Sequence, residues 1–367
     1  MTVAAALGGR LERSRAILDT VDADALLISR PALRRWLAGF VLHRGEETTS
    51  GYSGTLLVSR GAQLVLVDGR YHEQAQASCP EWDVRLTHGP IATELRALAA
   101  ELGISRVAAE AKVLSHADWL AIAVAGLELQ PADDPLRDLR MVKGADEIAA
   151  ISRACALTDA CFEHMLTFLH PGLSEHAVAW ELQAWFRANG AEDLAFDPLV
   201  LVGARAAMPH GHPGDTAIAA GQPLLIDFGC QVDGYRSDMT RTVFFGEPER
   251  ETRRRYDAVR QAQQLAFEAA APGIIGSALD GIARNHLAEM GLGEAFTHGL
   301  GHGIGLETHE EPILRHWQQP LQAGMVVTLE PGVYFPGEVG IRIEDDILLT
   351  DGGATWLTRS PRELVVL

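Results

Sequence analysis

The sequence has few cysteines, no long apolar run and no excess of basic residues, and each absence excludes a class of protein. Four cysteines lie among 367 residues without Cys-x-x-Cys spacing, which argues against a disulfide framework and a thiolate zinc site. No stretch approaches the roughly 18 apolar residues of a membrane helix, and the N-terminus lacks a secretory signal pattern. We expect a cytoplasmic protein.

Charge excludes further partners. The formal net charge is -18, which repels phosphate backbones and anionic lipid surfaces, so we expect no nucleic acid and no membrane as partners. The acidity also leaves carboxylates free to bind metals. With 47% hydrophobic and 22% charged residues, the chain is typical of a globular protein and is long enough for two domains.

The first 130 residues or so read as an α/β domain. Short runs rich in Val and Leu at 24–29, 54–59 and 63–71 predict strands, and the segment 92–103 predicts a helix. Two prolines and dense charge within 130–147 indicate a boundary, and we divide the chain into domains 1–135 and 136–367.

The second domain shows the same order of predicted helices and turn residues twice. A predicted helix, Pro-Gly, a second helix and Gly recur along the chain, so that Pro171 and Pro272, and likewise Gly190 and Gly291, are 101 residues apart. This repeat predicts an internally duplicated α+β domain with a pseudo-twofold axis, with a site between the halves. Chance matching of the Pro-Gly pairs is the alternative.

The stretch LLIDFGCQVDGYRSDMTRTVFF carries a first pair of carboxylates. Asp233-Gly234 between two β-prone runs predicts a hairpin turn, which places Asp227 opposite Thr240. Asp227 and Asp238 then lie diagonally on one face, with Cβ atoms about 7 Å apart. An exposed sheet face would tolerate both acids, but the flanking runs look buried, and buried neighbouring carboxylates need a cation or a proton.

A second pair lies in VVTLEPGVYFPGEVGIRIEDDILLT. A hairpin turn is expected around Pro336 to Gly340, with Glu330 at the end of one apolar run and Glu344 in the middle of another. Arg342, two residues before Glu344, shares its face and can orient a carboxylate.

Histidines come from two glycine-rich segments. GLGHGIGLETHEEP holds His302 and His309, and its alternating glycines suit a backbone that passes close to a metal and a substrate. Alone, His302 reads as a turn or core residue; beside four carboxylates, it reads as a ligand. His210 in AAMPHGHPGD stays open between a surface loop and a substrate contact, and we expect His212 and His298 to be structural or supporting residues.

Two aspartates, two glutamates and one histidine form an oxygen-rich donor set. This set favours a pair of divalent ions, Mn²⁺, Co²⁺, Fe²⁺ or Zn²⁺, over a single structural zinc. Ions about 3.5–4 Å apart bring a shared water towards hydroxide and polarise a carbonyl, which is hydrolytic chemistry.

The order HG, DFGxxxxGYxSDMTRT, GHGIGLExHEEP, TLEPGVY and IRIEDD resembles the pita-bread metallopeptidases, which include aminopeptidase P, prolidase and methionine aminopeptidase. In weaker form the match extends to LRRWLAGF, SGTLLV and VDGRYHEQA, which resemble the creatinase-like N-terminal domain of aminopeptidase P and prolidase. The resemblance implies a two-domain fold with a pita-bread catalytic domain, and it makes methionine aminopeptidase, which usually lacks the first domain, a poorer match.

The resemblance also implies roles for individual residues. Asp238 and Glu344 would bridge two metal ions, with Mn²⁺ expected first. Arg342 would support the metal ligands, with Tyr235 and Thr240 as flanking candidates. His210 and His309 would contact substrate, and Glu330 would also move a proton to the departing nitrogen. The five implied ligands are Asp227, Asp238, His302, Glu330 and Glu344.

The implied substrates are small peptides with proline at position 2. We expect an Xaa-Pro aminopeptidase, because some prolidases have an arginine directly after the HExP segment, where this chain has Ile313, with Arg315 two residues later. An Xaa-Pro dipeptidase is the alternative, and a non-catalytic pita-bread binding protein is a further one. Relatives commonly form homodimers, so Trp36 or Phe40 could reach a neighbouring site or be core residues.

Overall fold

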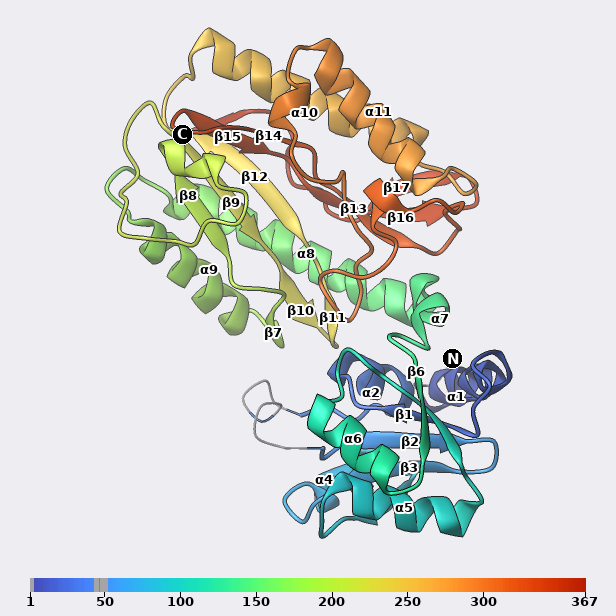
Figure 1. Ribbon diagram of the computed structural model, residues 1–367. Coiled ribbons are helices and arrows are strands. Elements are labelled where there is room, and N and C mark those ends of the chain that lie inside the picture. The colour runs from blue at the N-terminus through green and yellow to red at the C-terminus, as the bar shows by residue number, and fades with distance from the viewer. Residues whose placement is uncertain (1–2, 43–45, 47–51) are drawn as a thin grey trace. The chain divides into compact units, whose positions relative to one another are not determined.

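The computed structural model describes residues 3–42, 46 and 52–367. It divides into two compact units, Met1–Arg140 and Met141–Leu367 (Figure 1). Within the described residues, no helix is both long and apolar enough to cross a membrane.

The N-terminal unit is built on a six-stranded mixed sheet in the order β4-β3-β2-β1-β5-β6. The predicted strands appear as β1, β2 and β3, and the predicted helix appears as α5. Helices α2 and α5 end at Gly39 and Gly103, whose φ angles of 74° and 68° suit only glycine well. The strands are β1 (Ala25–Ile28), β2 (Thr55–Ser59), β3 (Gln63–Val67), β4 (Asp83–Leu86), β5 (Arg106–Ala109) and β6 (Glu128–Pro131); the helices are α1 (Val3–Thr20), α2 (Pro31–Ala38), α4 (His72–Ser78), α5 (Ile91–Leu102) and α6 (His116–Val124).

Trp36 and Phe40 are core residues of this unit. Their side chains are 1% and 0% exposed, and the guanidinium of Arg10 lies over the Trp36 ring. The core alternative is therefore the one that the structure supports.

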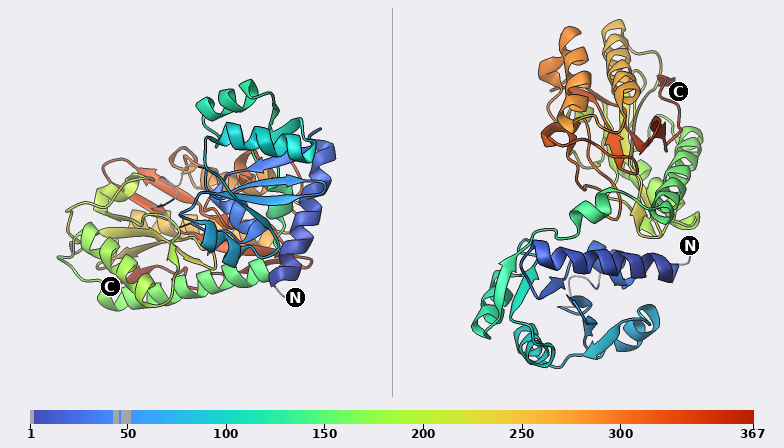
Figure 2. Two further views of the ribbon diagram at one scale, coloured as in Figure 1. Left: turned by 90° about the horizontal axis from the view of Figure 1, so that it is seen from below. Right: turned by 90° about the vertical axis from the view of Figure 1, so that its right-hand side faces the viewer.

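The C-terminal unit repeats a pair of helices, which confirms the predicted duplication. Its first pair is α8 (Ala145–Phe168) and α9 (Glu175–Ala188), and its second is α10 (Arg250–Ala269) and α11 (Gly276–Glu289). The ends of α8 and α10 are 101 residues apart in the chain. The starts of α9 and α11, and also their ends, are separated by the same 101 residues. Figure 2 shows the strands of this unit between the two pairs. The short helix α7 (Arg137–Met141) spans the boundary between the units.

The turns between paired helices are also repeated in their hydrogen bonds. Gly172 donates its N–H to Ile218, and Gly273 donates to Leu321, at 2.9 and 2.8 Å. Both glycines have φ close to +95°, a conformation that side chains with a Cβ rarely adopt. The matched Pro-Gly pairs of the sequence therefore reflect one turn used twice.

The strands of this unit form hairpins at the predicted places. Asp233 and Gly234 have φ angles of 50° and 85°, the geometry of a two-residue hairpin turn, and Asp227 pairs with Thr240 as predicted. The strands are β7 (Asp193–Leu194), β8 (Leu199–Val202), β9 (Pro223–Phe228), β10 (Cys230–Val232), β11 (Tyr235–Arg236), β12 (Met239–Phe244), β13 (Val326–Leu329), β14 (Gly332–Phe335), β15 (Val339–Arg342), β16 (Asp345–Thr350), β17 (Gly353–Trp356) and β18 (Val365–Val366).

Each helix pair packs on its own set of strands. One core joins α8 and α9 to β8, β9 and β12, and a second joins α10 and α11 to β13 through β16. Short 3₁₀ helices at Gly203–Ala207, Gly293–Ala295 and Leu314–His316 lie in the connecting loops. Since apolar side chains anchor both sets of strands, the polar ends of the hairpins are held firmly in place.

Candidate metal centre

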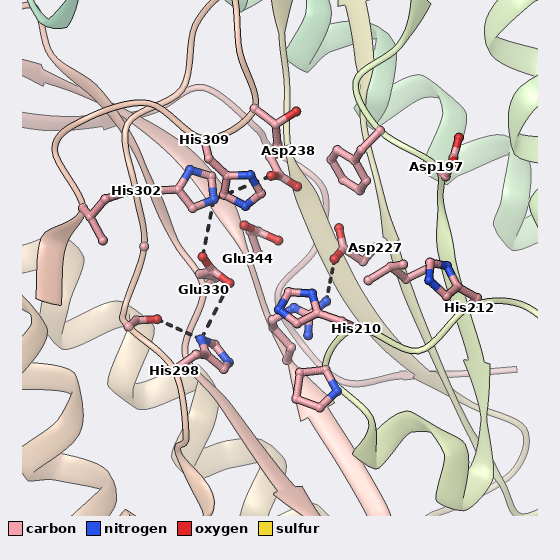
Figure 3. A pocket seen from close by; sticks show the side chains of 18 residues that line it. Asp197, His210, His212, Asp227, Asp238, His298, His302, His309, Glu330 and Glu344 are labelled. Atoms are coloured by element: carbon pink, nitrogen blue, oxygen red, sulfur yellow. Dashed lines mark hydrogen bonds and ion pairs between the residues drawn. The ribbon is translucent and has the colours of Figure 1, made fainter. Parts of the chain in front are cut away.

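One cavity of about 450 Å³ is lined by all eight residues to which the resemblance assigns a metal, catalytic or supporting role, but not by the flanking candidates Tyr235 and Thr240. Figure 3 shows their side chains converging from the two hairpins and from the two histidine-bearing loops. These residues are His210, Asp227, Asp238, His302, His309, Glu330, Arg342 and Glu344.

Asp238, His302 and Glu344 form the tightest cluster. One ligand atom from each lies within 4.8 Å of the other two, and all three side chains are buried. Nε2 of His302 is 3.9 Å from Asp238 and 3.5 Å from Glu330. These separations are too long for direct hydrogen bonds and suit atoms that face a common cation.

Asp227 lies next to this cluster and is fixed by Arg342. The Nη2 atom of Arg342 is 2.5 Å from one carboxylate oxygen of Asp227. The same guanidinium donates to the hydroxyls of Thr240 and Tyr334, at 3.0 and 2.8 Å. The Thr240 hydroxyl in turn donates to Glu344 at 2.6 Å. Arg342 therefore links carboxylates of both hairpins, as its place two residues before Glu344 suggested.

Crowded carboxylates perturb one another's ionisation. Burial, Glu344 and Asp227 raise the pKa of Asp238 well above its usual range. Burial together with Glu330 raises the pKa of Glu344 in the same way. Burial also raises the pKa of Glu330 to about 8. Without a compensating cation, Glu330 keeps its proton at neutral pH, and Asp238 and Glu344 take up protons more readily than ordinary carboxylates.

The donor set suits divalent cations. Among the described residues, Asp227 and Asp238 each bury one carboxylate oxygen (Oδ1) that has no hydrogen-bond partner, which is costly unless something else binds it. Burial lowers the pKa of His302 to about 3, so its imidazole is neutral at pH 7 and can ligate a metal. The Nδ1 atom of His302 is 3.0 Å from the carbonyl of Gly303, an arrangement that leaves Nε2 directed at the acids.

The remaining histidines lie around the cluster. The rings of His302 and His309 are 4.3 Å apart, and burial lowers the pKa of His309, so it is also uncharged at neutral pH. His298 bonds to the Tyr334 hydroxyl at 2.8 Å and lies 3.8 Å from Glu330, consistent with a supporting position. His210 and His212 line the same cavity, and in addition to burial the nearby His210 helps to lower the pKa of both His298 and His309.

The glycines of GLGHGIGLETHEEP make room mainly for other parts of the protein. A Cβ at Gly301 would lie 2.0 Å from the carbonyl of Thr328, and one at Gly303 would lie 2.3 Å from that of Glu311. Gly299 and Gly301 line the cavity, and for these two the expected closeness to metal and substrate stays a prediction. The alternation is thus needed chiefly for backbone packing against β13 and the HEEP segment.

Two acids beside Glu344 were not singled out in the sequence. Asp345 is fully buried and pairs with Arg241 at 2.7 Å. Asp346 accepts the backbone N–H of Asp238 at 2.9 Å and so fixes a predicted ligand of the other hairpin. The run of three acids in IEDD was the available signal, since consecutive buried acids in a strand each need a partner.

Other contacts differ from the sequence expectation. The hydroxyl of Tyr235 donates to Glu147 of α8 and not to the residues around Arg342. Arg315 does not line the cavity, whereas Ile313 does, together with Phe196 and Asp197, which carried no recognisable motif in the sequence.

Comparison with known proteins identifies the C-terminal unit first. Residues 149–351 match the model of metallopeptidase family M24, which covers more than half of the chain. The chain belongs to metallopeptidase family M24. Residues 10–142 match the creatinase/prolidase N-terminal domain. The predicted family and two-domain fold are therefore confirmed, and the protein is a metallopeptidase.

Individual M24 relatives extend over almost the whole chain. The peptidase YqhT of Bacillus subtilis strain 168 is 35% identical over 362 residues, covering 98% of this chain and 100% of the relative. A solved Xaa-Pro dipeptidase from Bacillus anthracis has 36% identity and a TM-score of 0.93, covering 98% and 100% of the two chains. An X-Pro aminopeptidase from Thermotoga maritima has 34% identity and a TM-score of 0.86, covering 96% and 100%.

Proposed function

We propose that this metallopeptidase is an Xaa-Pro aminopeptidase that removes an N-terminal residue from small peptides with proline at position 2. It would use two divalent ions, with Mn²⁺ expected first and Co²⁺, Zn²⁺ or Fe²⁺ as alternatives. The proposed ligands are Asp227, Asp238, His302, Glu330 and Glu344. The unpartnered oxygens of Asp227 and Asp238 beside His302 and Glu344 support this assignment.

One observation favours an aminopeptidase over a dipeptidase. Arg342 is the one lysine or arginine among the described residues that line the cavity, and it is already bonded to Asp227, Thr240 and Tyr334. A dipeptidase must hold the free carboxylate of proline, which favours a cation. The position after the HEEP segment is instead Ile313, an apolar wall suited to a continuing chain.

The proposed mechanism assigns a task to each side chain. When bound, the ions would activate a water and polarise the carbonyl that precedes proline. His309, with a neutral ring, would donate a hydrogen bond to that carbonyl oxygen as it gains charge. Glu330 would carry a proton to the departing proline nitrogen. His210, which also lines the cavity, would contact the peptide, and Arg342 would hold Asp227 in place.

Proline explains why such a site is specialised. The Xaa-Pro amide lacks an N–H and has a fixed ring, so proteases that bind substrates as a hydrogen-bonded strand handle it poorly. A cavity of about 450 Å³ lined by Phe196, Leu199 and Ile313 can accept the ring without such a strand.

An Xaa-Pro dipeptidase is the second candidate. The solved structure from Bacillus anthracis that resembles this chain over 98% of its length carries that name. The non-catalytic alternative has no such support, because all five implied ligands are present. A cytoplasmic location and a homodimer stay predictions.

Parallel assays would separate the two candidates. The Mn²⁺-loaded protein is incubated with an Xaa-Pro dipeptide, an Xaa-Pro-Yaa tripeptide and a Met-Ala-Yaa peptide. We expect cleavage of the tripeptide; cleavage of the dipeptide alone would overturn the aminopeptidase assignment, and cleavage of the Met peptide alone would overturn proline specificity. Ile313→Arg should raise dipeptide cleavage by supplying a cation, whereas Ile313→Met should not.

A further inference from the structure

Helix α11 carries a carboxylate–guanidinium pair that faces the His302 loop. Asp280 is 4% exposed and accepts two hydrogen bonds from Arg284, at 2.9 and 3.0 Å. Asp280 also accepts the backbone N–H of Leu300 at 2.8 Å. Arg284 donates to the carbonyls of Phe296 and His298, at 3.0 and 2.8 Å. The pair therefore fixes both ends of a short segment that leads to His302.

That segment leads to two proposed metal ligands. The carbonyl of Leu300 accepts the N–H of Glu330 at 2.7 Å, so the single residue Leu300 lies between Asp280 and Glu330. His302, two residues further on, exchanges two hydrogen bonds with Thr328, through its N–H at 3.1 Å and its carbonyl at 2.8 Å. A shift of Leu300 would displace Glu330 and His302 together.

A similar pair joins Glu175 of helix α9 to Arg205 of the 3₁₀ helix Gly203–Ala207, next to the His210 loop. Glu175 is fully buried and accepts hydrogen bonds from Arg205 at 2.9 and 3.0 Å. Glu175 also accepts the N–H of Gly214 at 2.7 Å, and Arg205 donates to the carbonyl of His212 at 2.7 Å. In both pairs, a helix carboxylate holds an arginine that grips the carbonyl of a cavity-lining histidine.

The two pairs are not at equivalent places in the repeat. The residue that matches Glu175 is Gly276, where a Cβ would lie 2.8 Å from the Cβ of Trp317, so no glutamate fits there. The second half uses Asp280, one turn further along its helix. Asp280 bonds to Leu300, which is itself bonded to Glu330. Glu175 also accepts the N–H of Val202 on β8 at 2.8 Å, and among the described residues neither Val202 nor the other hydrogen-bond partners of Glu175 and Arg205 have a hydrogen bond to a proposed metal ligand.

We propose that the two pairs are positioning residues with separate tasks. The Asp280–Arg284 pair sets the affinity for metal by holding Glu330 and His302. The Glu175–Arg205 pair sets the handling of the peptide by holding the loop of His210. The second assignment rests on the function proposed above; the first depends only on metal binding.

Asp280→Asn and Glu175→Gln test the division, because each removes one charge and keeps side-chain volume. Glu251→Gln is the matched control, since Glu251 pairs with Arg254 on the exposed face of α10. Mn²⁺ affinity is measured on the full chain by titration of the metal-free protein. We expect Asp280→Asn to weaken Mn²⁺ binding about 10- to 100-fold. Glu175→Gln and the control should change it less than about twofold.

Kinetics and hydrogen exchange give the second readout. At saturating Mn²⁺, Glu175→Gln should lower kcat/KM for an Xaa-Pro-Yaa peptide about 10-fold or more, and Asp280→Asn should recover most of its kcat. Exchange of backbone amides should quicken within 205–216 in Glu175→Gln and within 296–302 in Asp280→Asn. If either variant fails to fold, Arg205→Lys and Arg284→Lys replace them. Lysine keeps the positive charge but lacks the planar guanidinium that donates several hydrogen bonds at once.

The outcomes separate the inference from the function it rests on. Two outcomes would overturn the proposal of separate tasks, because they would show that both pairs serve stability alone. One is an equal loss of metal in both variants, and the other is normal Mn²⁺ affinity and normal amide exchange in both. Should the wild type cleave no Xaa-Pro peptide, the proposed function fails, while metal affinity and local exchange still decide between the two tasks.

Discussion

The two halves of the C-terminal unit share a framework and differ in their loops. The first half runs from α8 to β12 and the second from α10 to β17. Helix ends, Pro-Gly turns and hairpins correspond, and each hairpin brings two carboxylates to the cavity. The framework alone therefore supplies a symmetric set of four acids, Asp227 and Asp238 from one half and Glu330 and Glu344 from the other.

Histidines break this symmetry. The second half places one atom of His302 within 4.8 Å of Asp238 and Glu344, with His309 beside it, whereas the first half offers His210 and His212 from its own loop. Arg342 also comes from the second half, yet it bonds to Asp227 of the first. The duplicated scaffold thus brings in its acids symmetrically while its histidine loops differ. In the proposed function the second half would supply both the ligand His302 and the substrate contact His309, and the first half only the substrate contact His210.

The acids, which both halves supply to the cavity, give the largest expected effect. Asp238→Ala and Glu344→Ala each remove one proposed metal ligand, from a different half. Both should lose bound metal and at least about 10³-fold in kcat/KM. Metal content after dialysis and peptide assays would check this, with the exposed Asp257→Ala on α10 as control. Full metal content in either variant would break the equivalence of the halves.

The differing part is tested by one histidine from each half. His302→Ala should lose metal because it removes a proposed ligand. His210→Ala should keep metal and lose about 10- to 100-fold in kcat/KM through the substrate. The metal content of both variants is measured. Loss of metal in His210→Ala would show that the histidine loops of both halves serve metal binding, which would contradict the proposed difference between them.

A smaller effect is expected for His309. His309→Ala should lower kcat about 100-fold with metal retained, because it removes one hydrogen-bond donor to the developing oxyanion. Steady-state kinetics at saturating Mn²⁺ measure the change. An unchanged kcat would refute the role given to this side chain.

The smallest effect concerns pH. In the metal-free protein the pKa of Glu330 is raised to about 8, so the folded state keeps a proton that the unfolded chain has already lost. That contribution to stability disappears as pH rises through about 8. Metal replaces the proton, so the stabilisation by Mn²⁺ should grow from pH 6 to pH 8 by roughly 1.4 kcal/mol per pH unit for each proton released. Thermal unfolding with Mn²⁺ and with chelator would measure this stabilisation at each pH. A stability difference between the two conditions that does not change with pH would contradict the expectation.

Much of this framework could be predicted because its signals are local. Asp233-Gly234 set a hairpin register that the structure reproduces at Asp227 and Thr240, and repeated Pro-Gly turns revealed the duplication. Local patterns fix strand pairing wherever a two-residue turn leaves one register.

Contacts between distant segments could not be predicted in this way. The sequence does not say which acids of IEDD face the cavity, because Asp345 finds Arg241 and Asp346 finds the N–H of Asp238, both more than 100 residues away. Tyr235 similarly bonds to Glu147 across 88 residues. The partner of a buried polar group is a property of the assembled fold.

The separation of the ligands along the chain has a consequence for biosynthesis. Asp238 is made 106 residues before Glu344, an interval of about 5 to 20 s at ordinary translation rates. Throughout that time the first hairpin has its acids but lacks Glu344, and for the first 64 of the 106 residues it lacks His302 as well. Ribosome-bound chains that end before Glu344 should therefore retain little metal, and loading should follow the completion of synthesis.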